Sequence, residues 1–176
     1  MKRPRVVVIG GGTGTFTVLS GLKLYPLDLS AIVTMADDGG STGVLRDELG
    51  VLPPGDVRQC LVALSKSPQF LRQLMNYRFA EGGLAGHSFG NLFLSALEKM
   101  TGSFDKAVEM AGEILQIEGQ VIPSTLNRVK LIAELRSGAL VRGQDKIHHA
   151  PLSGNLRRIY LEPKAKANPK ALSAIK

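Results

Sequence analysis

The first 36 residues hold two short apolar runs separated by a glycine-rich turn and a helical segment. The run "RVVVIG", residues 5–10, is β-branched and closed by glycine, which is typical of a buried strand. Apolar residues then recur near helical spacing until Pro26 ends the segment. The run "LSAIVTMA", residues 29–36, predicts a second buried strand. Strand, helix and strand in this order form a βαβ unit, so we expect a parallel sheet.

The rest of the chain continues as helices and short strands. The sequence predicts that Asp56 caps one helix, that Ser67 caps the next, and that two further helices each end in glycine. Short strands follow within residues 120–163, and Asn168 caps a last short helix. We therefore predict an α/β fold, a Rossmann-like three-layer sandwich with a mostly parallel sheet, forming a single domain over residues 1–176.

The amino-acid composition limits which kinds of protein this chain can be. Hydrophobic residues make up 44% of the chain, but no apolar run approaches the ~20 residues of a membrane span. The N-terminal run Val6–Ile9 is too short for a signal peptide, and Cys60 is the sole cysteine, so we expect a cytoplasmic protein. The net charge of +7 suits an anionic partner. With 5% aromatic residues and no basic helix, the sequence favours a small phosphorylated ligand over nucleic acid.

The first candidate site is the glycine cluster "GGGTGTF". Glycines between a strand and a helix let the backbone approach a phosphate, and the helix start offers N–H groups and a positive dipole. Neither G-x-G-x-x-G frame ends in Gly or Ala, so we expect no NAD, and a Walker Gly-Lys-Ser/Thr is absent from the sequence. The alternative is a tight turn without a ligand. The candidate phosphate-binding residues are Gly10, Gly11, Gly12, Thr13, Gly14 and Thr15.

The second candidate site is "ADDGGSTG", which follows the second predicted strand. The carboxyl ends of neighbouring parallel strands meet at one sheet edge, where ligands bind, so Asp37 and Asp38 should lie beside the glycine turn. Either carboxylate could accept ribose hydroxyls or hold Mg²⁺ against a diphosphate. Ser41 and Thr42 add hydroxyls to what we expect to be a ligand-facing loop. The alternative is an Asp-rich surface turn.

Two further motifs offer ligand contacts. Arg58 is predicted near a helix start, where it could reach a phosphate or pair with a carboxylate. The stretch "GHSFGN" matches the nucleophile elbow G-x-S-x-G, but the required strand before it is missing from the pattern. We interpret it instead as a helix N-terminus at which His87, Ser88 and Asn91 contact the ligand.

Several stretches together resemble a known family. They are "VVVIGGGTGTFTVLSGLK", "TMADDGGSTGVLRDELGVLPPGDVRQCLVAL", "GHSFGNLFLSALE" and "PSTLNRVKLIAEL". In this combination and order they resemble the gluconeogenesis-factor family, the YvcK type within the CofD-like superfamily. The resemblance implies a Rossmann-like sandwich. Because family members continue to a later "GPGS"-type loop, we expect these 176 residues to be the amino-terminal part of such a fold; the alternative is an unusually short member.

The resemblance also implies a function. YvcK-type members look like binders of UDP-sugars, notably UDP-N-acetylglucosamine, needed for cell shape and wall synthesis on gluconeogenic carbon. The CofD branch transfers a phospholactyl group from a GDP-linked donor to a deazaflavin alcohol with Mg²⁺, and its Asp pair, matched here by Asp37 and Asp38, contacts the acceptor. We expect a regulatory binder of this kind; a phospholactate transferase and an NAD-dependent oxidoreductase are the alternatives. The sequence is compatible with a homo-oligomer and does not fix the number of subunits.

Overall fold

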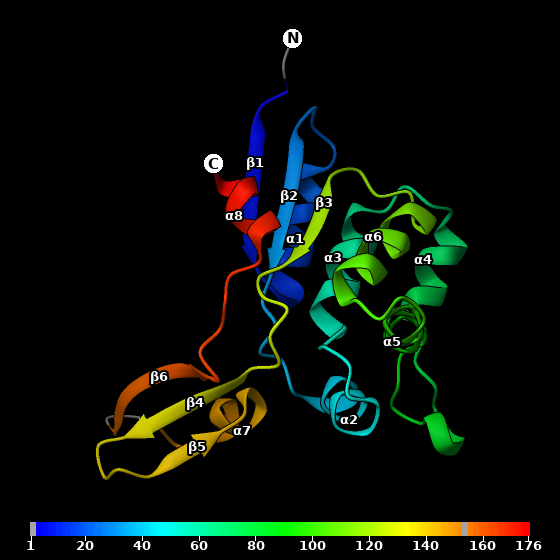
Figure 1. The fold of residues 1–176 in the computed structure, drawn as a ribbon. Helices are drawn as coiled ribbons and strands as arrows, with labels where there is room; N and C mark the ends of the chain where they lie inside the picture. The colour runs from blue at the N-terminus through cyan, green and yellow to red at the C-terminus, as the bar shows by residue number, and fades with distance from the viewer. Residues whose placement is uncertain (1–2, 153–154) are drawn as a thin grey trace.

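A three-stranded parallel sheet forms the centre of the fold in the computed structural model, which describes residues 3–152 and 155–176. Its strands β1 (Arg5–Gly10), β2 (Asp28–Val33) and β3 (Gln120–Pro123) lie in the order β1-β2-β3 (Figure 1). The register pairs the last residue of β1, Gly10, with the last of β2, Val33. The two strands therefore end side by side, as the βαβ pattern predicts.

Most of the helices pack on one side of this sheet. The elements on that side are α1 (Gly12–Leu22), α2 (Gly40–Leu49), α3 (Gly55–Leu64), α4 (Gln69–Asn76), the 3₁₀ turn η1 (Gly82–Leu84), α5 (Phe89–Thr101) and α6 (Phe104–Ile114). The core forms around α3, where Val57, Cys60, Leu61 and Leu64 are fully buried. Alternate β2 residues, Ala31 and Val33, point into the same core, because side chains alternate along a strand.

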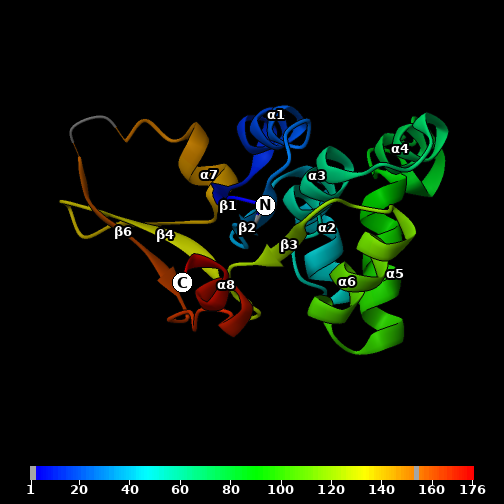
Figure 2. The ribbon, with the colours of Figure 1, turned by 90° about the horizontal axis from the view of Figure 1, so that it is seen from above.

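The helix α8 (Pro169–Ile175) lies on the opposite face of the sheet from α1, as Figures 1 and 2 show. Its Ala171 packs against Ile32 of β2 and Ile122 of β3, the residues that alternate with the main core. Helix, sheet and helix make three layers. The predicted α/β fold with a parallel sheet is confirmed.

Residues 126–166 leave the parallel sheet and fold separately, and we call them the antiparallel lobe. In it β4 (Lys130–Leu135), β5 (Leu140–Arg142) and β6 (Leu156–Glu162) form an antiparallel sheet of order β5-β4-β6, with α7 (Gln144–His149) beside β4. The chain enters and leaves at adjacent points, since Asn168 N donates to Ser124 O at 2.9 Å. The sequence predicted these strands, but not that they would pair into a sheet of their own.

Local details differ from the sequence predictions at three helix starts. Asp56 and Ser67 do not cap: Pro54 and Pro68 hold the cap positions, and the Ser67 hydroxyl contacts Ser65 Oγ at 2.6 Å. The expected "GGSTG" loop is instead the first turn of α2. Asn168 does cap α8, accepting from Lys170 N. Within the described ranges the longest helix, α5, has 13 residues, and none is long and apolar enough to cross a membrane.

Candidate functional site

Three helices begin at the edge where β1 and β2 end. The helix α1 starts directly after the glycine turn, and α3 starts beside it, because a Cβ atom on Gly11 would collide with Asp56 Oδ2. The start of α2 adjoins the same point, since a Cβ on Gly55 would lie 2.5 Å from Thr42 Oγ1 and 3.1 Å from Asp37 Oδ2. These glycines are needed for the close approach. The starts of α1, α2 and α3 thus converge on one edge.

The residues that directly precede these three helices do not cap them with a side chain. In the part of the chain that the structure describes, the N-cap residues Gly11, Gly39 and Pro54 form no side-chain cap, although Asp56 accepts a hydrogen bond from the backbone of Gly12 at the start of α1. By contrast, Ser88 caps α5 by accepting from Asn91 N, and it is almost fully buried. The first N–H groups of a helix have no partner within the helix, and the dipole makes that end positive. Three such ends at one edge favour an anion.

Asp56 faces the glycine turn. Its Oδ2 accepts a hydrogen bond from Thr34 Oγ1 at 3.3 Å, and it also accepts one from the backbone of Gly12. Burial, and then the charge of Asp37, raise the pKa of the Asp56 carboxyl, while the bonds from Gly12 and Thr34 oppose the shift. Sequence reasoning took Asp56 for a helix cap and missed this role. The signal available was its predicted place at a helix start after "PPG".

The paired carboxylates of Asp37 and Asp38 point to different partners. Asp37 lies at the start of α3, and its Oδ1 accepts from Gly39 N at 3.1 Å. Asp38 Oδ1 instead accepts from Asp145 N of α7 at 3.0 Å, so it holds the antiparallel lobe. The carboxylate that shares the edge with Asp37 is Asp56. We infer that only the first member of the pair faces the glycine turn.

Arg46 reinforces this junction with the lobe. Its Nη1 donates to Asp37 O at 2.7 Å, and its Nη2 donates to Val129 O at 2.8 Å. One guanidinium therefore bridges the end of the Asp pair and the beginning of the lobe. The Asp37 backbone is thereby tied to the beginning of the lobe.

The starts of α2 and α5 meet through three polar side chains. Ser41 Oγ lies 2.9 Å from His87 Nδ1, and Asn91 Nδ2 donates to Ser41 Oγ at 3.3 Å. The predicted residues Ser41, His87 and Asn91 are thus brought together from positions 46 to 50 residues apart. They form a polar wall next to the edge.

Arg58 stands behind this wall, with its side chain almost fully buried. Its Nε donates to Asn91 Oδ1 at 3.1 Å, and its Nη1 donates to Asn76 Oδ1. Burial, and then the charge of Arg78, lower the pKa of Arg58, while Asp56 opposes the shift. Its hydrogen-bond partners are neutral amides. The positive charge of Arg58 is therefore only partly offset, which favours an anion nearby.

Of the remaining residues predicted to contact a ligand, some are exposed and others are buried. Thr13 and Gly14 are exposed in the first turn of α1. Thr15 and Thr42 are buried, and Thr15 Oγ1 donates to Gly11 O at 3.1 Å. These two threonines therefore shape the backbone of the site, whereas Thr13 and Gly14 are accessible to a ligand.

We next ask whether the carboxylates at this edge could bind Mg²⁺. Within residues 3–152 and 155–176, no group of three His, Cys, Asp or Glu side chains is placed to hold a metal. Asp37 and Asp56 provide two carboxylates beside uncapped helix starts. Mg²⁺ is commonly held by one or two carboxylates together with phosphate oxygens. The residues fit Mg²⁺ bound jointly with a diphosphate, and they fit a free ion poorly.

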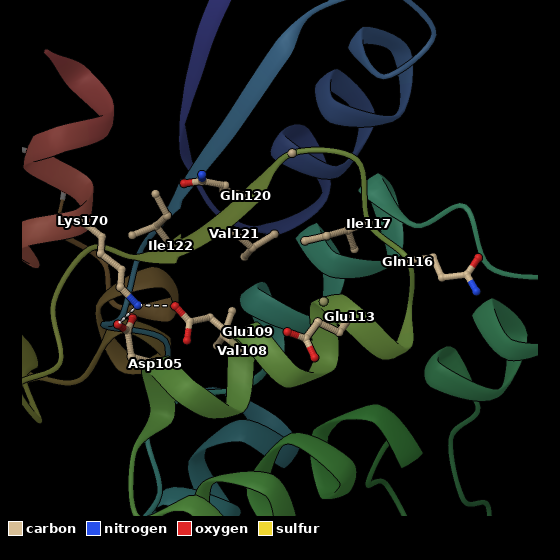
Figure 3. A pocket seen from close by; sticks show the side chains of 12 residues that line it. Asp105, Val108, Glu109, Glu113, Gln116, Ile117, Gln120, Val121, Ile122 and Lys170 are labelled. Atoms are coloured by element: carbon tan, nitrogen blue, oxygen red, sulfur yellow. Dashed lines mark hydrogen bonds and ion pairs between the residues drawn. The ribbon is translucent and has the colours of Figure 1, made fainter.

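A cavity of about 600 Å³ lies elsewhere, between α6, β3 and α8 (Figure 3). Its rim carries Asp105, Glu109 and Glu113, and Lys170 reaches across to pair with the first two. None of its lining residues belongs to the edge described above. Its acidic rim makes it a poor place for a phosphate.

Comparison with protein families matches residues 6–176 to the model of 2-phospho-L-lactate transferase CofD. The chain belongs to the CofD family. A relative from Nostoc sp. is 51% identical over 98% of this chain, which covers 37% of that relative. The gluconeogenesis factor of Listeria monocytogenes is 46% identical over 99% of this chain, which covers 54% of that protein. The chain thus spans about half the length, or less, of these CofD-family relatives.

Solved structures agree with the fold. Two crystal structures of a Bacillus halodurans protein, one of them described as a member of the UPF0052 family, match this chain with TM-scores of 0.92 and 0.91. Sequence identity is 44% and 42%, and the match covers 99% of this chain and 56% of the other. The CofD-family match extends over the glycine turn, the Asp pair and the antiparallel lobe alike.

Proposed function

We propose that this chain forms the nucleotide-binding part of a gluconeogenesis factor and binds a nucleotide diphosphate-sugar similar to UDP-N-acetylglucosamine. The observation that carries the proposal is the convergence, at the edge of the parallel sheet, of three helix starts whose N-cap residues provide no side-chain cap. A diphosphate has two adjacent anionic groups, which such N–H groups and dipoles bind together. The naming of the Listeria relative supports the wider role.

Each part of the edge has a task in this proposal. The backbone from Gly10 to Thr15 holds the diphosphate. Asp37 and Asp56 accept sugar hydroxyls or share Mg²⁺ with the phosphates, where the ion would supply positive charge. Ser41 and His87 hydrogen-bond the sugar or base, and Arg58 adds positive charge from behind.

In this function the bound nucleotide-sugar reports carbon supply to cell-wall synthesis and cell shape. A binder needs no reacting group, and the only histidine at the edge, among the residues described, is already bonded to Ser41. The chain is then a sensor in a regulatory protein.

The second candidate is a transferase using a GDP-linked donor. It is favoured by the match to the 2-phospho-L-lactate transferase model and by the Asp37 and Asp56 carboxylates beside the turn. It requires Mg²⁺, a donor whose phospholactyl group is joined to GMP through a diphosphate, and an acceptor alcohol, whose oxygen displaces GMP from the phosphorus to give a phosphodiester.

Calorimetric titration separates the candidates. UDP-N-acetylglucosamine, GDP and NADH are titrated with and without Mg²⁺ into this chain and into the longer Listeria relative. We expect selective binding of the UDP-sugar by both proteins. Preference for GDP with Mg²⁺, together with product detected by mass spectrometry, would support the transferase instead. If neither protein binds any UDP-sugar, the proposal fails.

A further inference from the structure

A groove of about 580 Å³ lies between α1 and α4, outside the edge assigned to the nucleotide. In Figure 2, α3 lies between α1 and α4, and its Val62 lines the groove. Phe16 comes from α1, Lys23 is the C-cap residue at the end of α1, and Arg72 comes from α4. A volume of this size is ordinary for a small-molecule site, for which about 300–1,000 Å³ is usual.

Two cations from different helices lie in this groove. Lys23 Nζ donates to Ser65 O at 3.1 Å, and Arg72 Nη1 donates to Ser67 O at 2.9 Å, so both reach the same short turn. An ammonium has three donors and a guanidinium has five, so most of their donors remain after these bonds. The two groups are held together although like charges repel.

The nearest acid does not neutralise this pair. Among the residues the structure describes, neither Lys23 nor Arg72 has a carboxylate within ion-pair distance, and Glu118 is paired with Lys66. Burial, and then the charge of Arg72, lower the pKa of Lys23, and Glu118 opposes the shift. The groove therefore keeps a positive potential that an anion would relieve.

The rest of the lining suits a hydroxylated molecule. Ser20, Gln69 and Gln73 offer hydroxyl and amide groups, which bind hydroxyls through both donors and acceptors. Phe16 and Tyr77 supply ring surface for the C–H faces of such a molecule. We propose that this groove is a second ligand site, which binds the phosphate monoester of a small polyhydroxylated compound, with Lys23 and Arg72 on the phosphate.

The groove adjoins the nucleotide edge at one residue. Asn76 lines the groove and also accepts the hydrogen bond from Arg58, which in turn contacts Asn91. A ligand in the groove is therefore close to the polar wall without sharing its residues. This placement makes the two sites separable by mutation.

The test is titration of the whole chain with glucose 6-phosphate, 3-phosphoglycerate, inorganic phosphate and glucose. We expect saturable binding of the phosphate monoesters, weaker binding of inorganic phosphate and none of glucose. Lys23→Gln and Arg72→Gln should each weaken binding at least tenfold, and Gln73→Glu should do the same by adding a negative charge. Lys106→Gln, an exposed position on α6 outside the groove, should leave binding unchanged.

Two results would overturn the proposal. One is the absence of binding by both phosphate monoesters. The other is binding that survives Lys23→Gln and Arg72→Gln but disappears with Asp37→Asn, because the phosphate would then lie at the nucleotide edge. The nucleotide proposal is judged separately, since UDP-N-acetylglucosamine binding should persist in Lys23→Gln and Arg72→Gln.

Discussion

The parallel-sheet region and the antiparallel lobe place their charges differently. In the parallel-sheet region the polar side chains gather at one edge, where Arg58 is only 8% exposed and is bonded to two amides. In the lobe, Arg157 and Arg158 both pair with Glu134 while their own side chains are 66% and 64% exposed. Buried polar groups require exact partners, whereas exposed ones are satisfied by water.

The net charge follows the same division. Residues 126–166 contain nine of the 22 Lys and Arg residues but three of the 15 Asp and Glu residues, so this stretch carries +6 of the net +7. The remainder of the chain is close to neutral. A basic total therefore says little about the nucleotide edge, whose positive potential comes from helix starts and one buried arginine.

The largest expected effect on ligand binding lies at the border between the two regions. Asp37→Asn should weaken nucleotide-sugar binding in Mg²⁺ at least tenfold, about 1.4 kcal/mol, because the negative charge that attracts the cation and one of the two acceptor oxygens are lost. Asp38→Asn should leave binding within about threefold, under 1 kcal/mol, and instead loosen α7, because the charged acceptor of Asp145 N is replaced by the weaker acceptor of a neutral amide.

Calorimetry measures the first effect, and hydrogen exchange at residues 144–149 measures the second. The two variants differ by one position and change the same charge, so each controls for the other. Equal loss of binding in both would show that the border does not separate the two roles.

The second prediction compares two arginines. Arg58→Met should lower the free energy of unfolding by about 2–3 kcal/mol, because the Asn76 and Asn91 amides lose a charged partner inside the protein. Arg158→Met in the lobe should cost about 1 kcal/mol or less, since Arg158 is itself exposed and Arg157 still pairs with the buried Glu134. Urea unfolding of both variants tests this, and similar costs would contradict the contrast between buried and exposed charge.

Sequence patterns predicted the parts of this fold that are local. The apolar runs and glycine turn identified β1, α1 and β2, and Asn168 was correctly taken as a cap. Such features depend on residues within a few positions of one another. The separate antiparallel sheet was missed because pairing partners such as Lys130 and Glu162 are distant in sequence.

The candidate site was predicted unevenly for the same reason. The glycine turn, Asp37 and the trio of Ser41, His87 and Asn91 were identified, and the structure brings the trio together. Asp56 was missed because its contact with Gly11 spans 45 positions, while its local pattern resembled a capping box. The contact of Asp38 with Asp145 spans 107 positions and leaves no local pattern.

The third prediction compares two serines that each accept one backbone hydrogen bond. Ser88→Ala should lower the free energy of unfolding by about 1 kcal/mol, because α5 loses its only side-chain cap among the described residues. Ser137→Ala, in the exposed turn before β5, should cost no more than about 0.5 kcal/mol. Thermal unfolding measures both, and a larger loss from Ser137→Ala would contradict the view that the lobe tolerates surface changes.

The smallest expected effect is a change in pH dependence caused by Asp56, which is half-buried. Its pKa is raised by burial and by Asp37, so the folded chain holds this proton more tightly than the unfolded chain. The stability that this group contributes is therefore present at low pH and is lost as the pH rises through its folded pKa.

In Asp56→Asn the side chain is neutral at every pH, so this loss of stability does not occur. Relative to the parent, this variant should gain stability as the pH rises from 4 to 7. Urea unfolding at several pH values measures this gain. Asp47→Asn controls for the loss of one exposed carboxylate. The difference in free energy of unfolding between Asp56→Asn and the parent could instead stay constant over this range, or fall. The glycine turn would then hold the carboxylate in its charged form, and the edge would bind a cation better than a bare diphosphate.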